Sequence, residues 1–73
     1  MLSFEIVRKG KAVQICCDDE GLNTHIATLE KLRGTATHVH LRSPAGGGDQ
    51  LSDQDPWGTK VGISEVIITT GGD

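Results

Sequence analysis

The stretch Thr37-His38-Val39-His40-Leu41-Arg42 decides how the chain is expected to fold. Successive side chains of a β-strand point to opposite faces. One face of this stretch therefore carries threonine, valine and leucine, and the other carries His38, His40 and Arg42. The alternation predicts a strand whose first face packs on a core and whose second face is polar and chemically distinctive.

The segment that follows, residues 43–60, has neither a helical nor a strand period. Loops this long are uncommon in compact domains unless they have a function or are disordered. The loop combines a run of three glycines with an acidic and aromatic set, Asp49, Asp53, Asp55 and Trp57. We therefore expect it to serve recognition and to contribute little to stability.

Two short alternating runs upstream, residues 2–7 and 12–17, predict a β-hairpin. Gly10 lies between them and can adopt the positive φ that a tight turn requires. A last strand is predicted over residues 61–70, where the apolar phase changes near Ser64 and Glu65. A bulge there or a late start of the strand would explain the change. Residues 71–73 are expected to be a frayed tail.

Residues 18–34 carry the signals of an amphipathic helix. Asp18 is a candidate N-cap, acidic residues follow it in the first turn, and Gly34 can end the helix. One apolar stripe runs along the predicted helix and comprises Leu22, Ile26, Leu29 and Leu32. Gly21 is an unfavourable residue inside a helix unless it falls in the first turn.

The order strand, strand, helix, strand, strand predicts an α+β fold in a single domain, residues 1–73. We expect a two-layer sandwich: a mainly antiparallel four-stranded sheet with one helix on one face. The residues expected to pack on the helix stripe are Phe4, Ile6, Val13, Ile15, Val39 and Leu41. The opposite face is expected to stay open and to carry Glu5, Gln14, Cys16, His38, His40 and Arg42.

Composition excludes several functional classes. A net charge of −3 argues against nucleic-acid binding, which needs clustered lysine and arginine. The first apolar run contains Glu5 and is too short for a signal peptide or a membrane span, which predicts a cytoplasmic protein without a membrane anchor. Cys16 and Cys17 are adjacent and would point to opposite faces, so both are expected to be reduced thiols.

His38 and His40 would lie about 7 Å apart on one strand face, close enough to bind one transition metal. Cys16 could supply a third ligand, so a metal-binding or metal-dependent domain is one alternative. No nucleophile motif, phosphate-binding loop or calcium loop accompanies these residues. We therefore predict neither an enzyme nor a cofactor.

The loop has the composition of a protein interface, because tryptophan often anchors interfaces and carboxylates steer a basic partner. Trp57 could equally fold back over the small core. Both interpretations of Trp57 remain open at this point.

Several of these features together resemble the family 32 immunity proteins of bacterial polymorphic toxin systems. They are the helix beginning at Gly21-Leu22, the His38-Val39-His40-Leu41 strand, the glycine-rich loop reaching Leu51-Ser52 and the closing apolar strand. The resemblance covers about residues 13–69, and the His-x-His-Leu strand with its loop is its most specific part. Members of the family carry an aromatic residue just before the loop glycines, where this chain has Pro44-Ala45.

The resemblance implies a small cytoplasmic protein that binds and neutralises a cognate toxin, expected here to be basic. On this hypothesis His38, His40 and Arg42 contact the toxin from the open face. Asp49, Asp53, Asp55 and Trp57 contact it from the loop. A second copy of the chain could also use the open sheet face.

Overall fold

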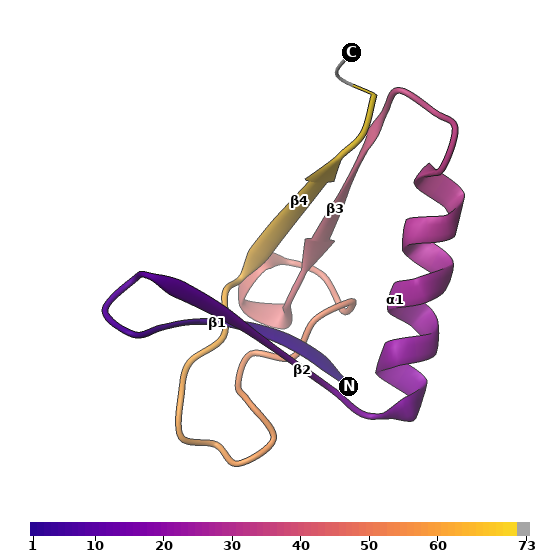
Figure 1. The fold of residues 1–73 in the computed structure, drawn as a ribbon. Helices are drawn as coiled ribbons and strands as arrows, with labels where there is room; N and C mark the ends of the chain where they lie inside the picture. The colour runs from indigo at the N-terminus through magenta and orange to yellow at the C-terminus, as the bar shows by residue number, and fades with distance from the viewer. Residues whose placement is uncertain (72–73) are drawn as a thin grey trace.

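The computed structural model describes residues 1–71, so residues 72 and 73 of the tail expected at residues 71–73 lie outside the described residues. The chain forms a small α+β fold, as predicted (Figure 1). Its elements in order are β1 (Leu2–Val7), β2 (Ala12–Cys17), α1 (Asp19–Leu32), β3 (His38–Arg42), the 3₁₀ turn η1 (Pro44–Gly46) and β4 (Glu65–Thr69).

The strands form two separate antiparallel pairs, β1 with β2 and β3 with β4, in place of the single four-stranded sheet that was expected. The reason is that loop backbone occupies the other edge of β1. Ser52 N–H donates to Leu2 C=O at 2.7 Å, and Ile63 N–H donates to Phe4 C=O at 2.7 Å. With these groups satisfied, β1 has no edge left for another strand.

Helix α1 begins as the sequence predicts. The Asp18 carboxylate accepts a hydrogen bond from Gly21 N–H at 2.7 Å, and Gly34 follows the helix with a φ of +76°. Gly21 lies in the first turn, where the chain start packs tightly on the helix. An added Cβ at Gly21 would come within 1.8 Å of the Met1 carbonyl oxygen, which explains why glycine is required there.

The core is smaller than predicted. Its central cluster has the buried members Leu2, Phe4, Leu41 and Leu51, with Val39, Ile63, Val66 and Ile68 partly buried against them. Leu32, the last residue of the predicted helix stripe, is also buried. Phe4 and Leu41 therefore confirm the predicted core, and Val39 does so in part. The prediction was wrong for Ile6, Val13 and Ile15, which are exposed. Ile6 and Val13 lie toward the hairpin tip, which points away from α1 (Figure 1), and Ile15 lies on β2, which no further strand flanks.

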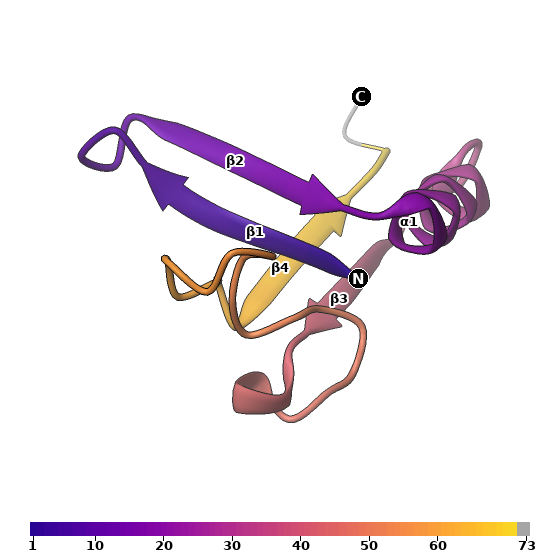
Figure 2. The same ribbon diagram turned by 90° about the horizontal axis from the view of Figure 1, so that it is seen from below.

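Residues 43–60 are a structural part of the fold and not a loose excursion. Leu51 is only 3% exposed, the lowest value in the apolar core. Gly48 lies so close to β3 that an added Cβ would come within 2.7 Å of the Arg42 Cβ. Figure 2 shows the loop passing alongside β1, where it makes the backbone hydrogen bonds described above. The last strand starts late, at Glu65, which accounts for the phase change in the sequence.

Candidate protein-interaction surfaces

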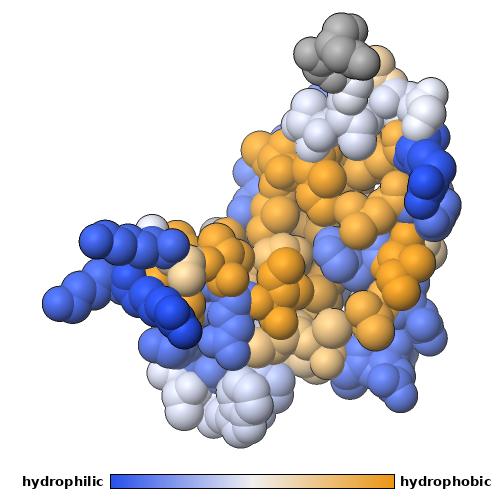
Figure 3. Space-filling view, in the orientation of Figure 1, coloured by the Kyte–Doolittle hydropathy of each residue, from blue (hydrophilic) through white to orange (hydrophobic). Residues whose placement is uncertain are grey.

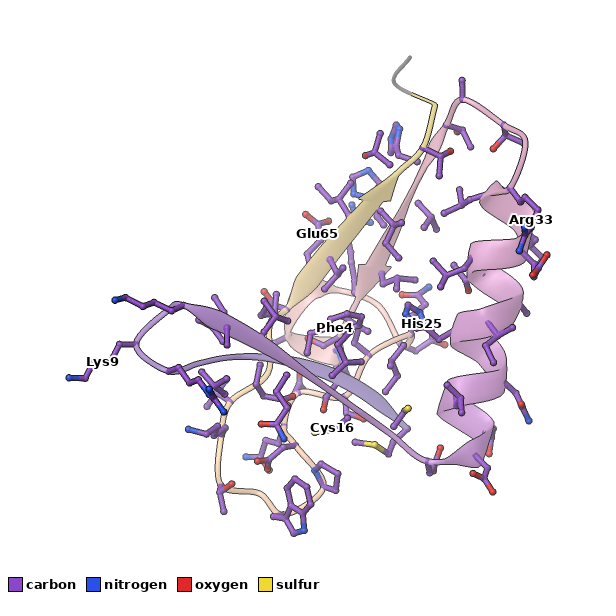
Figure 4. The ribbon with its side chains drawn as sticks, viewed as in Figure 1. Phe4, Lys9, Cys16, His25, Arg33 and Glu65 are labelled. Atoms are coloured by element: carbon purple, nitrogen blue, oxygen red, sulfur yellow. The ribbon has the colours of Figure 1, made fainter. Side chains whose placement is uncertain are left out.

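One candidate surface is the outer face of the β3–β4 pair, which we call the histidine face. Its strand register places Arg42 opposite Glu65, His40 opposite Ile67 and His38 opposite Thr69. These six residues share one face because the partners of an antiparallel pair point the same way. Figure 4 shows Glu65 on the side of the pair away from α1, so the helix does not cover this face.

The charges of the histidine face are largely paired with each other. Glu65 Oε2 accepts a hydrogen bond from Arg42 Nε at 2.6 Å and lies 3.3 Å from His40 Nδ1. The bond from Arg42, with a further contribution from His40, lowers the pKa of the Glu65 carboxyl. The His38 and His40 rings meet edge to face, with centroids 5.0 Å apart. Arg42 is therefore half of an ion pair and not a free cation.

Cys16 does not join the two histidines. It lies on the hairpin, away from Glu65 (Figure 4), and its thiol donates a hydrogen bond to Glu5 Oε1 at 3.4 Å. Burial raises the pKa of the Cys16 thiol, and the carboxylates of Glu5 and Asp55 add to this effect. Among residues 1–71, no three or more histidine, cysteine, aspartate and glutamate side chains are grouped so that they could hold a metal ion.

The hairpin face that carries Glu5, Gln14 and Cys16 was expected to be open, and the structure confirms this only for Gln14, which is exposed. Ser3, Glu5 and Cys16 on this face are all buried. The loop explains the difference, because Asp55 lies close enough to Cys16 to influence its pKa and is itself buried. The open face therefore comprises β3 and β4, and of the three predicted hairpin residues only Gln14 remains exposed.

The three loop aspartates have different environments. Asp49 is exposed, whereas Asp53 accepts a hydrogen bond from Ala45 N–H at 3.0 Å. Asp55 is 8% exposed. It accepts bonds from Thr59 N–H at 2.8 Å and from the Thr59 hydroxyl at 2.7 Å, and these bonds lower the pKa of its carboxyl. Asp53 and Asp55 hold the loop in shape, and Asp49 is the aspartate available to a partner.

Trp57 is 70% exposed, so it does not cap the core. It lies in the turn closed by the hydrogen bond from Gly58 N–H to Asp55 C=O, at 3.1 Å. The interpretation in which Trp57 folds back over the core is therefore wrong, and its role as an interface anchor stays a prediction.

A further surface was not foreseen from the sequence. We call it the apolar surface; it comprises the hairpin residues Ile6, Val13 and Ile15 and the helix residues Leu22, Ile26 and Leu29. Each of these side chains is between 43% and 61% exposed. Figure 3 shows apolar residues on the hairpin, at the centre of the molecule and on the side of α1, with a hydrophilic patch between the centre and the helix.

The rings of Phe4 and His25 join the two halves of the apolar surface. Their centroids are 5.8 Å apart at an interplanar angle of 81°, and both lie between the hairpin and α1 (Figure 4). The sequence did identify these apolar faces, but as faces packed against each other. The chain length could have indicated that some apolar residues stay exposed, because a domain this small buries only about 60% of its unfolded surface.

No helix within residues 1–71 has both the length and the apolar character needed to cross a membrane. Comparisons of the chain with protein-family models, with curated proteins and with solved structures found no match. The similarity to immunity proteins thus stays a prediction from the residues quoted above.

Proposed function

We propose that this chain is a protein-binding domain that neutralises a cognate bacterial toxin by direct contact in the cytoplasm. The observation that supports a binding role is the apolar surface, where six large aliphatic side chains remain about half exposed. Contiguous exposed apolar patches on small soluble domains commonly mark interaction sites. The identity of the partner as a toxin rests on the resemblance and not on this surface.

The free energies that burial and ion pairing can contribute favour the apolar surface as the main source of affinity. Burying the exposed half of one such side chain contributes about 1 kcal/mol, so the six together contribute on the order of 5 kcal/mol before the costs of association. An exposed ion pair such as Arg42–Glu65 contributes about 0–1 kcal/mol. We therefore assign affinity to the apolar surface and orientation to the charged groups around it.

The other predicted site residues have supporting roles in this proposal. His38, His40 and Arg42 contact the toxin from the histidine face, and Asp49 steers a basic partner. Trp57 is a second anchor because its indole is exposed on the loop. Asp53 and Asp55 act indirectly, since their carboxylates keep the loop in its conformation.

The test uses the purified full chain and the protein encoded by the neighbouring gene, which we take as the cognate toxin. We expect Ile26→Glu to weaken binding at least about tenfold in isothermal titration, because it places a charge within the apolar surface. Ala27→Glu is the matched control: it adds the same charge to the adjacent, exposed helix position outside the surface, and affinity should stay within about twofold.

Circular dichroism would verify that both variants fold. Equal affinities for wild type, Ile26→Glu and Ala27→Glu would show that the apolar surface is not the binding site. Absence of binding by the wild-type chain would reject the toxin as its partner.

A further inference from the structure

Strand β4 has one edge that no other strand covers. It pairs with β3 alone, and in Figure 1 no strand lies beside it on the side away from β3. Its sequence, Glu65-Val66-Ile67-Ile68-Thr69, contains no lysine, proline or glycine. Natural proteins usually protect a free edge with lysine, proline, a bulge or a covering segment. The β4 edge carries none of these devices within the strand, so it is suited to pair with another strand.

The hydrogen-bond phase shows which backbone groups this edge offers. Ser43 N–H donates to Ser64 C=O at 3.0 Å, and Thr70 N–H donates to Thr37 C=O at 2.8 Å, so both bonds join residues that face each other in the register. Bonded and non-bonded pairs alternate along an antiparallel ladder. Residues 66 and 68 therefore bond to β3, and Glu65, Ile67 and Thr69 direct their N–H and C=O groups outward.

Arg42 supports this assignment independently. It faces Glu65 in the register, yet its C=O accepts from Gln50 N–H at 3.0 Å and from Leu51 N–H at 3.1 Å, on the side of β3 away from β4. The Arg42–Glu65 pair is thus a non-bonded pair. Within the described residues, Glu65, Ile67 and Thr69 have no backbone partner beyond the β3–β4 ladder.

We infer that a second copy of this chain pairs with the β4 edge, antiparallel and about a twofold axis through Ile67. This register places Ile67 opposite Ile67 of the other copy and Glu65 opposite its Thr69. All three outward-facing residues of each copy then meet outward-facing residues of the other, as a bonded ladder requires. No like charges face each other, and the two β3–β4 pairs become one four-stranded sheet.

The side chains fit this register on both faces. Val66 of one copy faces Ile68 of the other on the inner side, where both are already partly buried. Ile67, which is 54% exposed, meets its own symmetry equivalent on the histidine face. Aliphatic and β-branched cross-strand pairs of this kind stabilise sheets. The dimer would also place the histidine faces of the two copies side by side.

The edge of β2 is also open, but it is a poorer site for a second copy. β2 runs directly into α1, which begins two residues after its last residue and stands at that end of the strand (Figure 1). Ile15 of β2 also belongs to the apolar surface already assigned to the toxin. Twofold pairing along β2 would compete with toxin binding, whereas pairing along β4 leaves the apolar surface of the hairpin and helix outside the strand junction.

The experiment is sedimentation equilibrium of the full 7.7 kDa chain from micromolar to millimolar concentration. We expect a reversible monomer–dimer equilibrium. Ile67→Lys should raise its dissociation constant at least about tenfold, because two lysines would face each other across the axis. Two matched controls carry the same substitution: His38→Lys on the histidine face of β3, and Ile15→Lys on the β2 edge. Both should leave the dissociation constant within about twofold of wild type.

A cross-link tests the register directly. In a Cys16→Ser, Cys17→Ser background, Ile67→Cys should form a disulfide-linked dimer under mild oxidation, since Cα atoms of a bonded pair lie about 5.5 Å apart. Glu65→Cys should not form one, because it faces Thr69.

A chain that stays monomeric at millimolar concentration would overturn the inference, and so would a dimer lost with Ile15→Lys but kept with Ile67→Lys. Monomeric protein whose toxin affinity falls with Ile67→Lys would mean that a toxin strand occupies the edge. These outcomes do not depend on the Ile26→Glu test, so the two proposals can fail separately.

Discussion

The loop at residues 43–60 contributes more to the core than the sequence predicted, and helix α1 contributes less. The loop has no period, is rich in glycine and aspartate, and was expected to be dispensable for folding. It supplies Leu51 to the core and, from Ser52 N–H, a backbone hydrogen bond to Leu2 of β1; Ile63, just after the loop, donates a second one to Phe4. The helix has a regular apolar stripe and was expected to cover the core, yet of the four stripe residues only Leu32 is buried, and Leu22, Ile26 and Leu29 stay about half exposed.

The period of apolar residues predicts the apolar side of an element but not how deeply that side is buried. A stripe with a period of 3.6 residues indicates which side of a helix is apolar. It does not state how close another element will come to that side. Burial depends on the path of the connecting backbone, and here the loop backbone passes closer to β1 than the middle of the helix does.

The largest effect in this comparison should come from Leu51→Ala. Leu51 is the most buried apolar side chain of the core, so truncating it leaves a cavity and should reduce the free energy of unfolding by about 2–5 kcal/mol. Urea denaturation followed by circular dichroism would measure the change. A loss below about 1 kcal/mol would contradict the structural role of the loop.

The next effect concerns the point where α1 is tightly attached. Intrinsic helix propensity predicts that Gly21→Ala stabilises the helix by about 1 kcal/mol. The structure predicts the opposite sign, because the new Cβ would meet the Met1 carbonyl oxygen; overpacking of this kind costs about 1–3 kcal/mol. The same denaturation experiment decides between the two signs. Stabilisation by Gly21→Ala would show that the chain start does not pack on the first helical turn.

Local signals predicted the elements well because their causes are local. The Asp18 cap, the glycine after the helix and the alternation in the β3 strand all act within a few residues, and each is present in the structure. The pairing of strands could not be predicted in the same way. It depends on Ser52 and Ile63 reaching β1 from far along the chain. No periodic pattern marks Ser52, and the apolar phase around Ile63 does not state which strand that residue will bond to.

In the candidate site, too, the features with local causes were predicted and those that depend on distant parts of the chain were not. Alternation placed His38, His40 and Arg42 on one exposed face, and the structure has them there. Glu65 was not identified as a site residue, although its register position opposite Arg42 determines the charge of that face. The apolar surface was also not identified, because it consists of residues that the sequence assigned to the core.

A smaller effect, visible as a pH dependence, should separate the loop aspartates. The bonds from Thr59 lower the pKa of Asp55 in the folded state below its unfolded value, which is about 3.9. A lowered folded pKa contributes stability above the unfolded pKa, and that contribution is lost as the pH falls through the folded pKa. Asp55→Asn should therefore reduce stability at neutral pH and make stability fall less steeply below pH of about 4.

Asp49→Asn is the matched control for the loop, because Asp49 is exposed and accepts no side-chain hydrogen bond within the described residues. Its denaturation midpoints should follow those of the wild type across the pH range. Equal pH profiles for the Asp49 and Asp55 variants would show that the Thr59 bonds do not stabilise the loop.

The smallest effect should be that of Leu29→Ala, in the middle of the helix stripe. A fully buried leucine would lose about 2–5 kcal/mol on truncation, but Leu29 is 43% exposed, and alanine has the higher helix propensity. We therefore expect a loss of about 1 kcal/mol or less in the isolated chain, measured beside Leu51→Ala under the same conditions. Leu29→Ala should weaken toxin binding more than Leu51→Ala does, because Leu29 belongs to the apolar surface and Leu51 does not. A stability loss as large as that of Leu51→Ala would mean that the helix packs on the core in solution, and the apolar surface would then not be free to bind a partner.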